Sequence, residues 1–352
     1  MNPPMSSPLP SPPSNVDAAA GEPRPTCRPP AKVRAQVARY DQTAEVGTWN
    51  GPRYRMTYRV LGQGPPLIWV PGIAATYRGY AMALNLLAER FQTIQYSYPG
   101  DAPDGARLGR ISHDDLVDDL FGLIDHLGLG KVFLAGLSFG STVVLKALAR
   151  EPRRFPRAVL QGAFAHRRFT LAERAALIVG RRFPGTLARL PLHEAVLSYN
   201  CRGDFPSLIA DRWDFHLEQH RLTPIRALAH RTTLVTRLDL RPILPTISTD
   251  VLLIHGREDR VVPPSHLEVL SAGLPRAEAV VMPTVGHIPH LSHVDGFARL
   301  IGDWLLPAAP AGCTGHDESA ERPGDCPLAG TACPGVGPGS PCAGPPSGHE
   351  LQ

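Results

Sequence analysis

A serine between two glycines is the first feature of this sequence that could do chemistry. Ser138 lies in the stretch AGLSFGS, residues 135–141, which follows directly on the apolar run KVFL. A serine hydroxyl is a poor nucleophile until a nearby base removes its proton, and that base works best when a third group holds its tautomer. With 33 glycines in 352 residues, the Gly-x-Ser-x-Gly pattern could arise by chance, so its partners must be found elsewhere in the chain.

An aspartate and a histidine stand where such partners are needed. Asp259 lies in LLIHGREDRVVPP, directly after one apolar run, and His287 lies in VVMPTVGHIPH, directly after the next. Each residue alone has an ordinary interpretation, as a turn serine, a loop carboxylate or a surface histidine. Because all three follow predicted strands, we expect a nucleophile, a base and an orienting acid.

The elements that must position these residues alternate along the chain. Seven short apolar runs that end at turn residues predict strands at 54–62, 66–72, 91–100, 131–138, 157–164, 250–256 and 278–287. Amphipathic stretches predict helices at 77–91, 112–128, 141–155, 264–274 and 293–306. The second of these opens with Ser112 and Asp115, close to a capping box, and stops at Gly128. Such alternation predicts a mostly parallel sheet covered on both faces, with ligands bound beyond the carboxyl ends of the strands.

Composition divides the chain into five segments. Residues 1–35 and 307–352 are rich in Pro with few large apolar side chains, so we expect both to be disordered. Residues 36–164 and 247–306 form the two parts of the α/β core. Residues 165–246 show no convincing strand and predict helices at 170–183, 192–199 and 211–222. An insertion of this length is too long for a loop, so we expect a helical cap over the strand ends.

Four sequence stretches together resemble the α/β-hydrolase superfamily. They are VPGIAAT from residue 70, GLSFGS as the nucleophile elbow, IHGREDRVVP as the acid loop and VGHIPH as the histidine loop. The order Ser138, Asp259, His287 is the serine, acid, histidine order of that superfamily. The resemblance covers residues 45–306 and implies an α/β-hydrolase fold: a mostly parallel, twisted sheet flanked by helices, with an inserted helical cap.

The resemblance also implies an oxyanion hole and an elbow. The backbone N–H groups of Phe139 and Ile73 would hold the oxyanion, although Pro71-Gly72 stands where many relatives have His-Gly. Since backbone groups donate, that departure should not abolish the hole. Side chains at Gly136 and Gly140 would collide with the neighbouring strand and helix, so these glycines allow the strained turn.

Several alternatives stay open at this point. Glu258 could replace Asp259 as the acid, although the family pattern DRVVP favours Asp259. A serine nucleophile excludes the haloalkane dehalogenases and epoxide hydrolases, which need an aspartate there. No metal site is expected. The histidines at 287, 290 and 293 do not have the i, i+4 spacing of metal ligands on a helix. The tail cysteines, with His316 and His349 near them in the sequence, could be imagined as a zinc site, but no two of these cysteines form a Cys-x-x-Cys pair.

The cap is expected to shape the substrate pocket. Its arginines include Arg167, Arg168, Arg181 and Arg182. They could recognise an anionic substrate, but solvated helix faces are the more ordinary interpretation. Its aromatic residues include Tyr199, Trp213 and Phe215. They could line the pocket, but aromatic residues of a small helical layer are more often core.

These observations predict a serine hydrolase of carboxylic esters with small or medium hydrophobic substrates, and no cofactor. The alternatives are other chemistry of the same triad (lactonase, C–C bond hydrolase, aminopeptidase, acyltransferase or perhydrolase) or a protein that only binds a small ligand.

Net charge is +4 without long runs of like charge, so we expect no nucleic-acid partner. No apolar stretch predicts a membrane span, and no secretory signal is evident, which favours a cytoplasmic protein. The sequence does not determine the oligomeric state.

Overall fold

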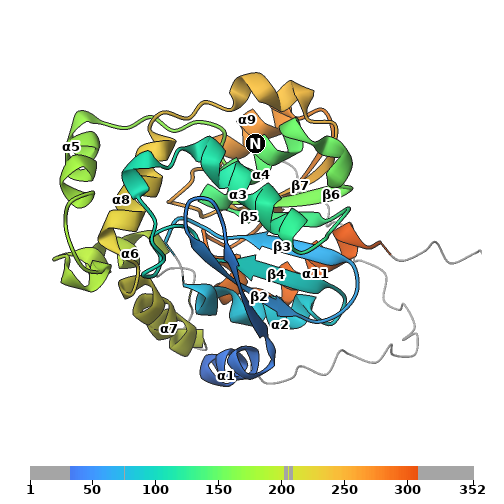
Figure 1. Ribbon diagram of the computed structural model, residues 1–352, viewed down its shortest axis with the longest axis horizontal. Helices are drawn as coiled ribbons and strands as arrows, with labels where there is room; N and C mark the ends of the chain where they lie inside the picture. Colours follow the sequence, from blue (N-terminus) through green and yellow to red (C-terminus); the bar gives the residue numbers. More distant parts are fainter. Residues whose placement is uncertain (1–31, 75, 202–204, 206–208, 308–352) are drawn as a thin grey trace, which may run out of the picture. The chain divides into compact units, whose positions relative to one another are not determined.

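The computed structural model describes residues 32–74, 76–201, 205 and 209–307, and within them eight strands form a single sheet. The strand order is β1-β2-β4-β3-β5-β6-β7-β8. β2 is antiparallel to both β1 and β4, whereas all other neighbouring strands are parallel. The predicted mostly parallel sheet is therefore confirmed (Figure 1).

The strands lie close to their predicted positions. Their bounds are β1 Glu45–Asn50, β2 Arg55–Leu61, β3 Pro66–Val70, β4 Gln92–Tyr96, β5 Phe133–Leu137, β6 Arg157–Gln161, β7 Asp250–Gly256 and β8 Ala277–Met282. β1 was not predicted because it is a polar, mostly exposed edge strand, without the apolar run that marks the inner strands. The strand predicted to reach His287 ends at Met282, since the chain then turns at Thr284, where φ is 56°.

Helices cover both faces of the sheet. Their bounds are α1 Val33–Thr43, α2 Ala81–Leu87, α3 His113–His126, α4 Phe139–Arg150, α9 Ser265–Gly273, α10 Pro289–Ser292 and α11 Val294–Leu305. Alternate strand residues enter two separate hydrophobic clusters: Ile68 and Val70 pack with α3 and α4, and Leu67 and Trp69 pack with α1, α2 and α11. The inner strands are apolar throughout because both of their faces are buried in this way.

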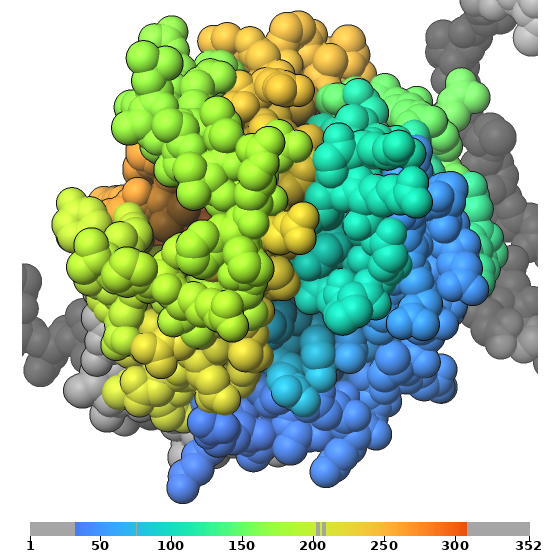
Figure 2. All heavy atoms as spheres, turned by 60° about the vertical axis from the view of Figure 1, so that its left-hand side comes forward, coloured from blue at the N-terminus to red at the C-terminus, as the bar shows by residue number. Residues whose placement is uncertain are grey.

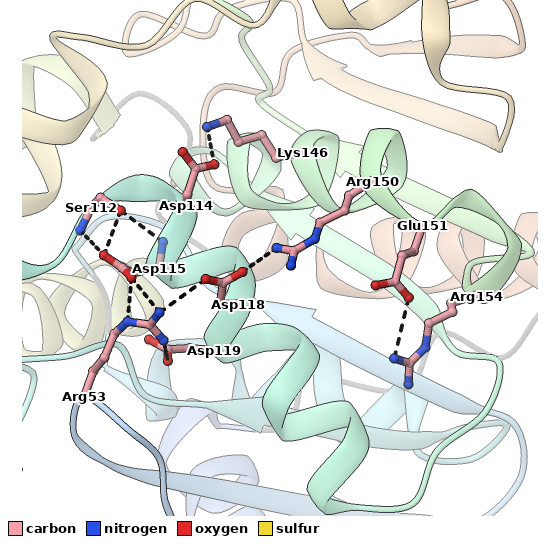
Figure 3. Close-up of polar contacts among 10 residues, drawn as sticks. All are labelled: Arg53, Ser112, Asp114, Asp115, Asp118, Asp119, Lys146, Arg150, Glu151 and Arg154. Carbon is pink, nitrogen blue, oxygen red and sulfur yellow. Dashed lines mark hydrogen bonds and ion pairs between the residues drawn. The ribbon is translucent and has the colours of Figure 1, made fainter.

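The predicted start and end of α3 are confirmed. Ser112 accepts a hydrogen bond from the N–H of Asp115, whose carboxylate accepts one from the N–H of Ser112, which completes a capping box. The helix stops at Gly128, where φ is 65°. Ion pairs tie α3 to the chain before β2 and to α4 (Figure 3), namely Arg53 with Asp115, Asp118 and Asp119, Lys146 with Asp114, and Arg150 with Asp118.

Between β6 and β7 the chain forms the segment predicted to be helical. It contains α5 Leu171–Gly180, α6 His193–Cys201, α7 Ala210–Arg221 and α8 Ile225–Val235, with short 3₁₀ helices at Leu187–Arg189 and Arg241–Thr246. The described part of 165–246 has isolated β-bridges but no strand. α8 was not predicted, because its buried positions include the polar residues His230 and Arg231, which hide its apolar face. In Figure 2 these helices, light green to yellow, occupy one side of the face that is turned forward.

One predicted boundary is wrong. α1 begins at Val33, inside the segment 1–35 that was expected to be disordered. Val33, Val37 and Tyr40 are buried against the layer that contains α2, and this apolar face stabilises the helix. Residues 1–31 and 308–352, with all the cysteines except Cys201, lie outside the described residues. Within the described chain, no helix is both long and apolar enough to cross a membrane.

Candidate active site

Ser138 occupies a one-residue turn between a strand and a helix. β5 ends at Leu137 and α4 begins at Phe139, so Ser138 alone reverses the chain, with φ 49° and ψ −115°. This conformation is rare for a residue with a side chain, and it persists only where the surroundings impose it. Here the N–H of Ser138 donates to the carbonyl of Gln161 at 2.8 Å, and Ser141 Oγ donates to the Ser138 carbonyl at 2.6 Å.

The glycines on either side of Ser138 allow close packing. A Cβ at Gly140 would lie 2.2 Å from the carbonyl oxygen of Val70, at the end of β3. A Cβ at Gly136 would lie 2.8 Å from Val144 Cγ2 and 2.9 Å from Ser141 Cα, both in α4. Any side chain at these positions would push α4 away from the strands, so the turn needs glycine at both.

The structure brings the three predicted residues into one hydrogen-bonded chain. His287 Nε2 lies 3.0 Å from Ser138 Oγ, and His287 Nδ1 lies 2.7 Å from Asp259 Oδ2. The carboxylate of Asp259 is fully buried, and the His287 side chain is 11% exposed. With Nδ1–H donating to Asp259, Nε2 of a neutral imidazole is left free to accept the serine proton.

Asp259 is held as a charged acceptor. Its Oδ1 accepts hydrogen bonds from the N–H groups of Val261 and Val262, at 2.9 and 2.8 Å. Burial alone would raise the pKa of Asp259, but the neighbouring His287 and the Val262 N–H favour the charged form, so its pKa is lowered overall. The alternative acid, Glu258, is exposed, and only Asp259 of the two contacts His287.

Two neighbours that fix His287 were not predicted from the sequence. Gly162, with φ 54°, lies so close that a Cβ there would be 2.9 Å from His287 Cε1. Gln161 Nε2 donates to the His287 carbonyl at 3.0 Å. A glycine at the end of the 157–164 run was a signal for close approach, but nothing in the sequence names the residue that approaches.

The loop after β3 lies close to Ser138 and to the start of α4. A Cβ at Gly72 would be 3.8 Å from Ser138 Cβ, so this loop passes directly over the serine. Ile73 lines the same cavity as Ser138. Phe139 is the first residue of α4, and the N–H at that position has no acceptor within the helix. Together with the dipole of α4, these groups favour negative charge beside Ser138.

Ser138 and His287 open into a cavity of about 430 Å³ between the sheet and the helical segment. Most of its walls are apolar, and the apolar lining includes Ile73, Leu187, Leu192, Val196, Leu228 and Leu291. No lysine or arginine is among the described residues that line it. The cavity therefore suits an uncharged, apolar ligand.

The cap residues singled out earlier lie away from this cavity. Trp213 and Phe215 are buried core residues, and Tyr199 is 72% exposed. Arg167 pairs with Glu173 at the surface. Arg181 and Arg182 line a separate surface groove between α5, α8 and residues 100–110.

Several histidines contribute to the polar part of the cavity wall. His193 Nε2 and His220 Nδ1 are 2.7 Å apart, and His216 and His290 lie deeper. Burial lowers the pKa of His220 to about 4 and of His290 to about 3, so both are neutral at pH 7. His290 contacts the ring of Tyr80, at 4.9 Å between centroids. No group of three or more described His, Cys, Asp or Glu residues is arranged to hold a metal ion.

Comparison with known proteins places these features in a family. A family model described as alpha/beta hydrolase fold matches residues 65–294. The chain is 28% identical to the 2-hydroxymuconate semialdehyde hydrolase of Pseudomonas sp. strain CF600, over 71% of this chain and 90% of the relative. It is 26% identical to a pimeloyl-[acyl-carrier protein] methyl ester esterase of Xanthomonas campestris pv. campestris, over 69% and 95%. The crystal structure of the enol-lactonase from Burkholderia xenovorans LB400 has a TM-score of 0.65 at 22% identity, covering 74% of this chain and 98% of that one.

Proposed function

The chain belongs to the α/β-hydrolase family, and we propose that it hydrolyses carboxylic esters through an acyl-enzyme on Ser138. One observation carries this proposal: the hydrogen-bonded chain from Ser138 through His287 to Asp259 ends at the wall of an apolar cavity. A serine hydrogen-bonded to an imidazole that a buried carboxylate orients is an activated nucleophile.

The proposed reaction begins with attack on the ester carbonyl. Ser138 Oγ bonds to the carbonyl carbon while its proton passes to His287 Nε2. Asp259 keeps Nδ1–H on its own side of the ring and stabilises the imidazolium that forms. The negative charge that develops on the carbonyl oxygen is stabilised by the N–H groups of Phe139 and Ile73.

The leaving alcohol then takes its proton from His287, which gives the acyl-enzyme. A water molecule loses a proton to the same imidazole and attacks the acyl carbon, after which Ser138 is expelled and reprotonated. No step needs a redox change or a cofactor, because one imidazole accepts and returns every proton.

The cavity supports a substrate of small or medium size with an apolar acyl or alcohol part. The 2-hydroxymuconate semialdehyde hydrolase suggests carbon–carbon bond cleavage as the competing proposal. Substrates of that type carry a carboxylate, and no cationic side chain is found among the described residues lining this cavity. An ester therefore fits this cavity better, since burying an unpaired carboxylate is costly.

Reaction with a fluorophosphonate probe, followed by intact-mass analysis, tests the proposal. We expect one adduct on the wild-type protein, none on Ser138→Ala, and slow labelling of His287→Ala. Glu258→Gln serves as the matched control for Asp259→Asn, because the two carboxylates are neighbours and only Asp259 contacts His287. A panel of p-nitrophenyl esters with increasing acyl length then defines the preferred substrate.

Two results would contradict the proposal. A well-folded wild-type protein that neither labels nor cleaves any ester would indicate a ligand-binding protein without turnover. Labelling of Ser138 together with cleavage of a vinylogous diketone, but of no ester, would indicate carbon–carbon bond hydrolysis.

A further inference from the structure

An arginine from the helical segment reaches the loop above Ser138. Arg231, on α8, is only 1% exposed and is one of the largest fully buried side chains. Its Nε donates to the carbonyl oxygen of Ile73 at 2.9 Å, and its Nη1 donates to Asp101 Oδ1 at 2.7 Å. Asp101 in turn accepts from the N–H of Tyr98 through Oδ2, at 3.0 Å. A buried guanidinium is retained only where such partners satisfy it.

The same loop is held at two further atoms. Tyr98 Oη donates to the carbonyl of Pro71 at 3.1 Å, and the N–H of Gly72 donates to Tyr80 Oη at 2.8 Å. Both tyrosines are buried. The peptide between residues 71 and 72 is therefore fixed at its oxygen and at its nitrogen.

The peptide between residues 72 and 73 is the one that carries the Ile73 N–H. The preceding peptide is fixed by Tyr98 and Tyr80, and the following peptide is fixed by Arg231 at the Ile73 oxygen. With these neighbours held, the peptide can turn only by opposed changes in ψ of Gly72 and φ of Ile73, so the contacts restrict its orientation. The Ile73 N–H is thus oriented without using its own hydrogen-bonding capacity, as an oxyanion donor requires.

We propose that Arg231 is a positioning residue for the oxyanion hole, through which the helical segment sets the direction of the Ile73 N–H. This inference rests on the proposed function, in which Ile73 is one of the two oxyanion donors. It makes α8 part of the reaction machinery as well as part of the cavity wall. Arg231 itself does not touch the substrate and acts only through Ile73.

A substrate pair that differs in one atom tests this role. A thionoester presents sulfur, a poorer acceptor, where an ester presents oxygen, so an intact oxyanion hole prefers the ester. We expect Arg231→Met to lower kcat for the ester by about 10- to 100-fold with KM changed less than about threefold, because small displacements at a reacting centre are costly. We also expect the ester-to-thionoester ratio of kcat/KM to fall about tenfold. A loss of folded protein would lower both substrates equally and leave this ratio unchanged.

Arg212→Met is the matched control. Arg212 is also a buried arginine of the helical segment, but its Nη1 donates to the carbonyl of Leu291, at 3.0 Å, and not to the oxyanion loop. We expect it to leave the ester-to-thionoester ratio unchanged. Amide hydrogen exchange of residues 72–74 gives a second measurement that needs no turnover, and it should become faster in Arg231→Met but not in Arg212→Met. If Arg231→Met fails to fold, Arg231→Lys and Asp101→Asn replace it, since each retains part of the contact.

The outcomes separate the two proposals. A wild-type protein that neither labels nor cleaves esters contradicts the proposed function. The amide exchange of residues 72–74 then tests by itself whether Arg231 holds the loop. If Arg231→Met changes neither this exchange nor the substrate ratio, the role of Arg231 is overturned even where the wild-type protein is a good esterase. A lower ester-to-thionoester ratio together with faster amide exchange in Arg231→Met, both absent in Arg212→Met, supports the positioning role of Arg231.

Discussion

The carboxyl-terminal edge of the sheet, which carries Ser138, and the outer helices α5 and α6 of the helical segment are built in opposite ways. At the edge, Asp259 and His287 are buried, Ser138 is partly buried, and hydrogen bonds join the three side chains. In the outer helices, α5 has no buried residue, and Leu171, Val179 and Val196 are 85%, 64% and 59% exposed. Chemistry needs fixed atoms, whereas a cavity wall needs only approximate shape, so the two regions should respond very differently to substitution.

α7 and α8 connect the two regions, and α8 does so beside the proposed reaction. It belongs to the helical segment by sequence, yet Ala227, Ala229 and Arg231 on it are buried. Its Arg231 contacts the Ile73 carbonyl, in the loop beside Ser138. The helical segment is therefore not uniform: α5 is exposed throughout, whereas α7 and α8 bury side chains against the rest of the protein.

The largest effect is expected at the nucleophile. Ser138→Ala should lower kcat for an ester on the order of 10⁶-fold, because the step that forms the acyl-enzyme disappears. Steady-state kinetics on the preferred p-nitrophenyl ester checks this, with circular dichroism to confirm folding. Residual turnover above about a hundredth of the wild-type rate would mean that another group attacks the ester.

The next largest effect is expected at the acid. Asp259→Asn should lower kcat by roughly 10⁴-fold, because an amide cannot hold the Nδ1–H tautomer or stabilise the imidazolium. The neighbouring Glu258→Gln should leave kcat within about twofold. Equal losses in the two variants would show that the acid is not assigned correctly.

The same Gly→Ala substitution, made at two different glycines, should change the free energy of unfolding in opposite directions. Gly140→Ala places a Cβ 2.2 Å from the Val70 carbonyl, and we expect it to lower the free energy of unfolding by about 3 kcal/mol. Gly296→Ala on α11 meets no atom within 4 Å, and we expect a gain of about 0.5–1 kcal/mol, since alanine favours a helix. Urea denaturation measures both. Similar values for the two would contradict the close packing at the elbow.

Buried histidines between the two regions should make the fold sensitive to acid. Burial lowers the folded-state pKa of His290 to about 3 and of His220 to about 4, well below the value near 6.5 of an unfolded chain. Between pH 6.5 and 4 the unfolded state thus binds more protons, so stability falls as the pH falls, by about 1.4 kcal/mol per pH unit for each such histidine.

His290→Gln tests this pH dependence. We expect the variant to lose less stability than the wild-type protein when urea denaturation at pH 7 is compared with pH 5. If the two proteins show the same difference, the acid sensitivity comes from groups other than His290.

The smallest effect is expected in the outer helices. Val196→Ser should change the free energy of unfolding by no more than about 0.5 kcal/mol, because the side chain is already 59% exposed. Since Val196 also lines the cavity, KM for the longer esters should rise a few-fold while kcat is unchanged. A large loss of stability would show that this helix is packed more tightly than its exposure indicates.

The sequence alone determined the sheet and the order of the proposed site residues. Inner strands such as β5 and β7 were predicted because a strand buried on both faces must be apolar throughout, and this pattern is local. Ser138, Asp259 and His287 were found because each follows an apolar run predicted to be a strand, and the carboxyl ends of parallel strands meet at one edge. The polar edge strand β1 and helix α8 were missed because neither shows a clear apolar pattern.

Only the tertiary structure decided which atoms meet. Gly162 beside His287, the tyrosines at Pro71 and Gly72, and Arg231 at the Ile73 carbonyl are contacts between residues from 8 to 158 positions apart. No local pattern encodes such a pair, because each contact depends on how strands and helices pack after the chain has folded. The sequence therefore determined which residue types stand at the strand ends, and packing determined how precisely their backbone and side chains are held.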